Sequence, residues 1–429
     1  MKYNQINSEL FIQNRERFKK QLKANSIAIF NSNDEHPWNG DALHSFKQNS
    51  DLFYLSGIDQ EETILVLFPD CVIEEFRECL FVKRTDEKMI TWNGYKVNQK
   101  HATEISGIKN VYWTDEFEVK MRPMINYAQN IYLTLNENDR SVVSSHYKDL
   151  RFANEMRNKY PLHNFERAAP ILHRLRSIKS VHELELMKAA ISISEKMFNR
   201  VLKFVKPGAW ENEIEAEVIH EFLKNKANGH SFGPIVASGK NACILHYVDN
   251  NCQCKEGDLL LLDTGADYAN YASDMTRTIP INGKFSARQK QVYNAVLNVM
   301  REAKKLLKPG VMLMEYQKQV GLIMEKELID LGLINTNDIK NQNADWPAYK
   351  KYFMHGTSHF LGIDVHDVGM RYEPIKAGMT FSCEPGIYIN EEGIGIRLEN
   401  EILITETACI DLMEHIPIEV EHIEDLMQK

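Results

Sequence analysis

Residues 255–265, "KEGDLLLLDTG", and residues 376–386, "KAGMTFSCEPG", carry the pattern that decides the fold of this chain. In each stretch an apolar run leads to an acidic residue six positions after a glycine, Asp263 in the first and Glu384 in the second. Short apolar runs between turn signals are typical of buried strands. One acid at a strand end has an ordinary explanation as a turn residue. The repeated spacing is therefore the informative feature.

The repeat continues in the residues around these two strands. Each half offers a histidine, a strand-end acid and a second acid in the same order: His246, Asp263 and Asp274 in the first half, and His366, Glu384 and Glu399 in the second. The histidine precedes the strand-end acid by 17 residues in the first half and by 18 in the second. Each of these residues taken alone would be an ordinary core or strand-edge residue, but the mirrored order indicates an internal duplication.

Two long predicted helices with the same start and stop signals precede the strands. Each begins at a capping box, Ser180 with Glu183 and Ser286 with Gln289, continues with apolar residues at steps of three and four, and ends at Lys-Pro-Gly. A second amphipathic helix follows each, over 214–223 and 316–328. If the two halves pack about a pseudo-twofold axis, their four carboxylates converge on one point.

The N-terminal part has a different pattern. Buried strands of an α/β layer are predicted at 26–30, 63–68, 78–82 and 130–135. At 429 residues the chain suits two or three domains. We therefore expect an N-terminal α/β domain over 1–170 and a duplicated α+β catalytic domain over 171–429.

Composition restricts the class of protein. The chain is 43% hydrophobic and 26% charged, and its net charge of −9 argues against nucleic acid or an anionic membrane as a partner. We find no apolar run of membrane-spanning length and no signal-peptide core at the N-terminus. The number of cysteines is odd, at seven, so we expect reduced thiols and a cytoplasmic protein. The "CQC" at 252–254 has no second cysteine pair near it to complete a metal site.

Four carboxylates in one apolar pocket would repel one another and raise their pKa values, which divalent cations would relieve. Oxygen ligands with little nitrogen and no thiolate favour Mn²⁺, although Co²⁺, Fe²⁺ or Zn²⁺ could substitute. Two ions about 3.5–4 Å apart would hold a water or hydroxide between them as a nucleophile. The expected reaction class is hydrolysis.

The stretch "HGTSHFLGIDVHD", residues 355–367, places three of the fifteen histidines and two aspartates among apolar residues. Together with "LLDTGADY", "SDMTRT", "EPGIY" and "GIRLENEILIT", it resembles the pita-bread metallopeptidases, which comprise methionine aminopeptidases, Xaa-Pro aminopeptidases and Xaa-Pro dipeptidases. The resemblance implies a pita-bread fold for the C-terminal domain. It also implies five metal ligands: Asp263 on one ion, Asp274 and Glu399 bridging, and His359 and Glu384 on the second.

The same resemblance implies catalytic roles. His366 would donate to the scissile carbonyl and stabilise the oxyanion, and Glu384 would carry a proton from the attacking water to the leaving nitrogen. His355 would face the substrate, and His246 would line the same pocket. Asp367 is either a carboxylate that orients a neighbouring histidine or a simple turn residue.

The segment "QNSDLFYLSG", residues 48–57, resembles the N-terminal domain of the Xaa-Pro aminopeptidases, a domain that methionine aminopeptidases lack. The resemblance implies that Asp41 holds the ammonium group of the peptide, and Trp92 is a candidate wall of the pocket; surface exposure or ordinary packing is the alternative for both. Arg397 would pair with the acid two residues away or with a substrate carboxylate. Tyr388 would be pocket wall or core.

These observations predict a metal-dependent enzyme that removes the N-terminal residue from peptides with proline at the second position. The nearest alternative is a Xaa-Pro dipeptidase with the same two ions. A non-catalytic binding protein and a metal-free creatinase-type hydrolase share the fold, but the full set of ligands argues against both. We expect a homodimer or homotetramer.

Overall fold

The computed structural model describes residues 3–138, 140 and 145–428. The chain divides into two compact units, Tyr3–Arg176 and Ser177–Lys429. No helix among the described residues combines the length and apolarity that a membrane crossing requires. All seven cysteines lie in the described part of the chain and are free thiols.

The N-terminal unit is built on one six-stranded sheet in the order β6-β5-β4-β1-β7-β8. Its strands are β1 (Ser26–Asn31), β4 (Ile64–Leu67), β5 (Glu78–Val82), β6 (Asn110–Trp113), β7 (Asn130–Leu133) and β8 (Asn164–Arg167). Its helices are α1 (Glu9–Lys19), α2 (Ser50–Ser56), α3 (Glu87–Asn93), α4 (Gln99–Ser106), α5 (Phe117–Tyr127), α6 (Lys148–Lys159) and α7 (Ala169–Ser177). All four predicted strands are confirmed. A short hairpin, β2 (Pro37–Asn39) with β3 (Ala42–Leu43), stands outside the sheet.

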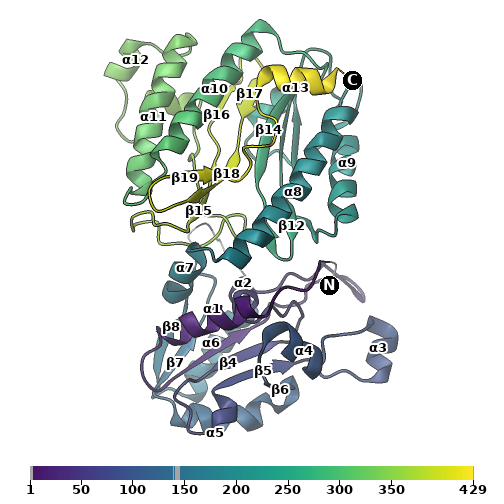
Figure 1. Cartoon of the computed structure of the whole chain (residues 1–429), viewed down its shortest axis with the longest axis vertical. Helices are drawn as coiled ribbons and strands as arrows, with labels where there is room; N and C mark the ends of the chain where they lie inside the picture. The colour runs from purple at the N-terminus through teal and green to yellow at the C-terminus, as the bar shows by residue number, and fades with distance from the viewer. Residues whose placement is uncertain (1–2, 139, 141–144, 429) are drawn as a thin grey trace. The chain divides into compact units, whose positions relative to one another are not determined.

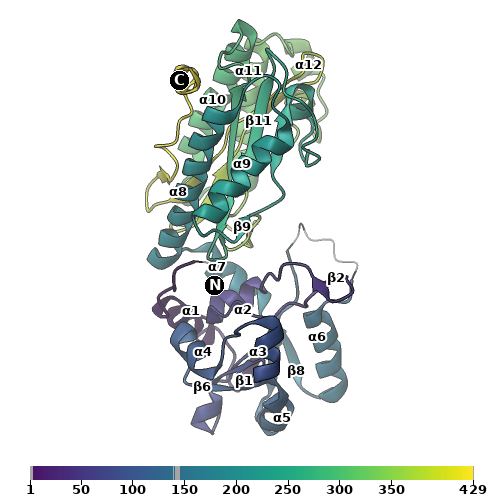
Figure 2. The same cartoon turned by 90° about the vertical axis from the view of Figure 1, so that its right-hand side faces the viewer.

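The C-terminal unit contains the predicted repeat. The first copy runs α8 (Val181–Phe204), α9 (Glu211–Lys224), β11 (Leu259–Thr264), the hairpin β12 (Ala266–Tyr268) with β13 (Tyr271–Ala272), and β14 (Met275–Pro280). The second runs α10 (Ala287–Leu306), α11 (Leu313–Asp330), β15 (Thr380–Cys383), the hairpin β16 (Gly386–Ile389) with β17 (Ile394–Arg397), and β18 (Asn400–Ile404). Both capping boxes form as predicted. In Figure 1 the pair α8/α9 and the pair α10/α11 flank the strands from opposite sides, and Figure 2 gives the view at right angles.

In both copies the last strand returns antiparallel to the first. Asp263 of β11 pairs with Thr276 of β14, and Cys383 of β15 pairs with Asn400 of β18. The two copies join where the Glu399 amide donates to the Thr276 carbonyl oxygen at 3.1 Å. Because both strand pairs meet at this seam, the acids at their ends are brought together.

The position of the core explains which way the acids point. Leu260 and Leu262 of β11 belong to the main apolar cluster with the helices, whereas Leu261 packs in a second cluster with Tyr388. The strand is therefore buried on both faces, as its unbroken leucine run indicates. Since side chains alternate along a strand, Asp263 shares the face of Leu261, away from the main helical core.

The remaining elements of this unit complete its edges. They are β9 (Gly229–His230), β10 (Ile235–Ser238), β19 (Cys409–Asp411), α12 (Thr336–Lys340) and α13 (Val420–Met427). Strand β10 pairs antiparallel with β11, and β19 pairs antiparallel with β18. Each copy of the strand pair thereby becomes a three-stranded sheet.

Candidate active site

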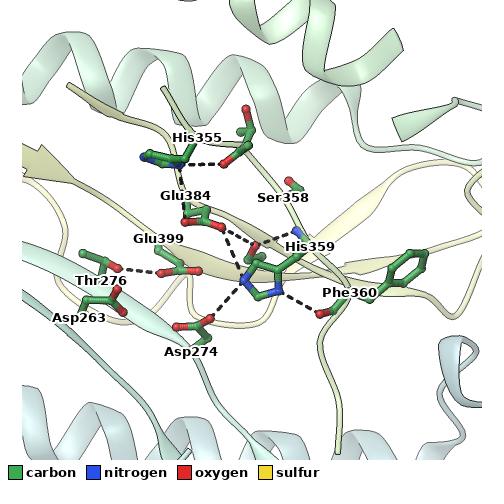
Figure 3. Close-up of polar contacts among 12 residues, drawn as sticks. Asp263, Asp274, Thr276, His355, Ser358, His359, Phe360, Glu384 and Glu399 are labelled. Carbon is green, nitrogen blue, oxygen red and sulfur yellow. Dashed lines mark hydrogen bonds and ion pairs between the residues drawn. The ribbon is translucent and has the colours of Figure 1, made fainter. Parts of the chain in front are cut away.

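Four carboxylates converge at the seam between the two copies (Figure 3). Asp263 lies on β11, Asp274 directly precedes β14, Glu384 directly follows β15 and Glu399 directly precedes β18. Asp263, Asp274 and Glu399 are buried, and Glu384 is partly exposed. The structure thus brings together the four acids that the sequence repeat singled out.

His359 faces this group through one particular ring nitrogen. Its Nδ1 lies 2.9 Å from the Phe360 carbonyl oxygen, which can only accept, so Nδ1 carries the proton. Its Nε2 then points to Asp274 Oδ2 at 3.3 Å and to Glu384 Oε1 at 3.5 Å. A neutral ring would present a bare lone pair to two carboxylates, so a cation or a second proton belongs there. This orientation of the ring is typical of a metal-binding histidine.

The electrostatics of the group fit a divalent cation. Ligand atoms of Asp274, His359 and Glu399 all lie within 4.8 Å of one another. Burial raises the pKa of Asp274 and of Glu399 above the ordinary range, and the neighbouring acids raise both further. Burial lowers the pKa of His359, but its carboxylate neighbours raise it above its usual value. Positive charge placed among these groups would remove the repulsion, and the donor set has no thiolate.

Two buried oxygens of the site have no hydrogen-bond partner in the described part of the chain, Asp263 Oδ1 and Glu399 Oε1. An unpaired buried carboxylate oxygen is costly, because nothing replaces the water it has lost. The other oxygen of each acid is held: Arg397 donates to Asp263 Oδ2, and Thr276 Oγ1 donates to Glu399 Oε2 at 2.7 Å. Each acid is therefore fixed through one oxygen and leaves the other for a bound ion.

Three polar residues that support the site were not predicted from the sequence. Besides Thr276, the Ser382 hydroxyl accepts from the His359 amide at 3.1 Å, and Glu401 Oε1 accepts from the Asp274 amide at 3.0 Å. Burial raises the pKa of Glu401 well above its usual value. Glu401 follows Glu399 by two positions, and this close spacing of two acids was the one signal available in the sequence.

A directed chain of hydrogen bonds links Asp263 to His355. Arg397 donates to Asp263 and, through Nη1, to the Tyr388 hydroxyl oxygen at 2.9 Å. His355 Nδ1 lies 2.8 Å from the Gly356 carbonyl oxygen and therefore carries the proton, so Nε2 accepts from the Tyr388 hydroxyl at 2.8 Å. Burial, and then the charge of Arg397, lower the pKa of His355 to about 3. His355 is accordingly neutral, with Nδ1 3.9 Å from Glu384 Oε2.

These hydrogen bonds bear on the alternatives for Arg397 and Tyr388. Of the two alternatives for Arg397, pairing with the acid two residues away is wrong, because its guanidinium pairs with Asp263 of the other half, and pairing with a substrate carboxylate stays a prediction. Arg397 is the last residue of β17, and Glu399 lies beyond its end, just before β18. Tyr388 is buried and belongs to the apolar cluster around Leu261, and its hydroxyl serves the hydrogen-bond chain.

The other two predicted histidines lie at the edge of the group. The His366 ring meets the His359 ring edge-on, with centroids 4.5 Å apart. His246 is exposed on the segment between β10 and β11, and its charge is one of the influences that lower the pKa of His355.

Asp41 and Trp92 lie in the N-terminal unit. Asp41 is exposed in the turn between β2 and β3, and Trp92 is 80% exposed on α3. Neither is part of the core of its own unit, and contacts with a substrate stay predictions for both residues.

Asp367 forms a buried ion pair that anchors the histidine-rich segment. Lys179 Nζ lies 3.1 Å from Asp367 Oδ2, and each side chain is 1% exposed. The Lys179 amide also donates to the Gly378 carbonyl oxygen at 2.8 Å, just ahead of β15. A Cβ atom on Gly362 would lie 2.2 Å from Asp367 Oδ2, so only glycine leaves room for the pair. Asp367 is thus more than a turn residue, and its partner Lys179 was not predicted.

Lys179→Met is expected to lower the free energy of unfolding by about 3–5 kcal/mol, because it leaves the Asp367 carboxylate buried without its counter-charge. Lys376→Met is the matched control: its ion pair with Glu373 is solvent-exposed, and such pairs contribute about 1 kcal/mol or less. Urea unfolding of both variants measures the difference. Equal stability losses would mean that the buried pair contributes no more than a surface pair.

Two known protein families match parts of this chain. The sequence profile of metallopeptidase family M24 matches residues 185–406, and that of the aminopeptidase P N-terminal domain matches residues 11–132. Xaa-Pro aminopeptidase of Escherichia coli (strain K12) is 32% identical over 99% of this chain and 98% of its own length.

Two solved structures of the E. coli enzyme are similar along the whole chain. The structures of aminopeptidase P with the inhibitor Pro-Leu and of its zinc-substituted form with product each superpose with a TM-score of 0.88 at 31% identity, covering 99% of both chains. The predicted pita-bread architecture with a separate N-terminal domain is confirmed by this similarity. The chain belongs to metallopeptidase family M24 and combines its peptidase domain with an aminopeptidase P N-terminal domain.

Proposed function

We propose that this protein is a metal-dependent Xaa-Pro aminopeptidase, which hydrolyses the bond between an N-terminal residue and a following proline. The observation that carries the proposal is the convergence of four carboxylates and the Nε2 atom of His359 at the seam of the repeat. The resemblance to Xaa-Pro aminopeptidases extends over 99% of the chain, including the N-terminal unit.

We further propose that the group holds two divalent ions, with Mn²⁺ as the working metal. Asp263, Asp274, His359, Glu384 and Glu399 would hold them, since carboxylate oxygens outnumber the single nitrogen and Mn²⁺ favours oxygen ligands. Bound ions supply Lewis acidity that makes water a nucleophile near neutral pH.

The residues around the ions then have separate tasks. Glu384 is partly exposed, and burial and nearby acids raise its pKa, which suits a group that accepts a proton from water and returns it to the leaving nitrogen. Burial and the charge of Arg397 keep His355 neutral, and both of its ring nitrogens are engaged, so it would stand beside Glu384 as a neutral hydrogen-bonding group rather than as a cation. His366 would donate to the scissile carbonyl oxygen, where negative charge develops.

A preference for proline tripeptides over proline dipeptides is the expected result that separates this function from a Xaa-Pro dipeptidase. Metal-stripped protein would be assayed with Mn²⁺ added back, on a Xaa-Pro-Xaa tripeptide, a Xaa-Pro dipeptide and a Met-Ala-Xaa tripeptide. Cleavage of the dipeptide alone would make the protein a dipeptidase. No cleavage of any substrate by metal-loaded protein would contradict the proposed function.

We also propose a homo-oligomer, a dimer or tetramer, in the cytoplasm. Large apolar side chains stand exposed on the N-terminal unit, with Trp38 at 70%, Trp92 at 80% and Tyr95 at 91% exposure. Exposed aromatic residues of this size favour an interface. The seven free cysteines are in keeping with a reducing compartment. Sedimentation velocity of the purified protein tests the oligomeric state.

A further inference from the structure

Glu211, the first residue of α9, is a fully buried carboxylate outside the candidate metal site. Its two oxygens accept five hydrogen bonds from residues 238–252, a segment that begins at the last residue of β10. Oε1 accepts from the Ser238 amide at 2.7 Å, the Ser238 hydroxyl at 2.7 Å and Asn241 Nδ2 at 3.2 Å, and Oε2 accepts from the Tyr247 hydroxyl at 2.7 Å and the Cys252 amide at 2.9 Å. A carboxylate offers about four lone-pair sites, so this one is saturated.

The two oxygens hold opposite ends of the same segment. Oε1 binds its beginning, where β10 ends at Ser238, and Oε2 binds its end, at Cys252. The Glu211 amide closes the connection by donating to the Cys252 carbonyl oxygen at 3.0 Å. One side chain therefore fixes the span of the whole segment 238–252.

This segment carries His246 and borders the candidate active site. Tyr247 is buried against Glu211, whereas its neighbour His246 is exposed. Tyr247 packs in one apolar cluster with Tyr388, the residue whose hydroxyl bonds to His355. The turn before His246 packs closely on β17, because a Cβ atom on Gly395 would lie 2.2 Å from the Ala242 carbonyl oxygen. The place of His246 is thus set by contacts that begin at Glu211.

We propose that Glu211 is a positioning residue that fixes His246 at the edge of the active site. The proposal rests on the proposed function, since it concerns a group that would line the peptide pocket. Misplacing a reacting group by about 1 Å can cost on the order of 100-fold in rate. An anchor with five hydrogen bonds limits such displacement, because every bond would have to be given up together.

Glu211→Gln tests this anchor with little change in side-chain volume. The glutamine NH₂ group would replace an oxygen that accepts hydrogen bonds, so its two hydrogens would face donors and those bonds would be lost. We expect kcat on a Xaa-Pro-Xaa tripeptide to fall about 10- to 100-fold, with bound metal unchanged. In a His246→Ala background the same substitution should lower kcat no more than about 2-fold, since the group it positions is gone. Glu213→Gln is the matched control on the same helix turn, because its carboxylate bonds to the Trp210 amide of its own helix cap.

A second variant and a second readout separate positioning from general stability. Tyr247→Phe removes one of the five bonds and should lower kcat about 3- to 10-fold, again without effect in the His246→Ala background. Hydrogen exchange followed by mass spectrometry should show faster exchange within 238–252 in Glu211→Gln, with exchange of β11 and β14 unchanged.

A wild-type kcat in Glu211→Gln would overturn the positioning role. So would a kcat of the Glu211→Gln/His246→Ala double variant that is lowered by the product of the two single losses. Failure of the wild-type protein to cleave the tripeptide is a different result: it would contradict the proposed function. The exchange of segment 238–252 would still decide whether Glu211 is its anchor.

Discussion

Asp274→Asn is expected to lower the affinity for metal by more than about 100-fold and kcat/KM by about 1,000-fold or more. The Asp274 carboxylate lies 3.3 Å from His359 Nε2, and ligand atoms of Asp274, His359 and Glu399 lie within 4.8 Å of one another. Asparagine has the same shape but no charge, so it would hold the proposed cations less well than the carboxylate does. Loss of a group that only supports a ligand typically costs about 10- to 100-fold, and loss of the ligand itself should cost more. Isothermal titration with Mn²⁺ and tripeptide hydrolysis measure the two effects.

The stability of the metal-free protein shows whether this loss comes from the site itself. Burial and the neighbouring acids raise the pKa of Asp274, so replacing it by a neutral amide removes repulsion from the metal-free site. Thermal unfolding without metal should therefore show no loss of stability. Asp258→Asn, the same change just before β11, should bind Mn²⁺ as the wild type does. Full metal affinity in Asp274→Asn would remove Asp274 from the proposed ligand set.

His366→Ala is expected to keep its metal and to lose about 100- to 1,000-fold in kcat, the typical effect of removing one donor to a developing oxyanion. The His366 ring meets the His359 ring edge-on at a centroid distance of 4.5 Å, and His366 is not among the five proposed ligands. Metal content by elemental analysis and kcat on a Xaa-Pro-Xaa tripeptide are the two measurements.

Each alternative role of His366 gives a different outcome. If the variant loses metal together with activity, His366 supports the His359 ring instead of acting on the substrate. If it hydrolyses the tripeptide at nearly the wild-type rate with metal bound, the oxyanion role is wrong. His415→Ala removes a surface histidine that pairs with Glu195 and should change neither property.

The features that the sequence predicted well are local or repeated along the chain. The capping boxes at Ser180 and Ser286 depend on residues three positions apart, and both form as expected. The leucine run before Asp263 predicted a buried strand, because such a strand has no solvent side to mark with polar residues. Strand β11 is indeed buried, on both of its faces. The mirrored spacing of acids predicted their convergence, since a duplicated fold places equivalent strand ends at equivalent points.

The tertiary structure alone decided how these residues are held. Arg397 pairs with Asp263 across 134 positions, Lys179 pairs with Asp367 across 188, and the Ser238 end of its segment reaches Glu211 across 27. A side chain's partner at such separations depends on which strands become neighbours and which faces they present, and no short spacing in the sequence records that. The sequence by itself thus determined the two-part architecture and the acids that would meet. The folded chain determined that Nε2 of His359 faces those acids. It also determined that the Lys179–Asp367 ion pair and the Glu211 carboxylate fix the segments around them.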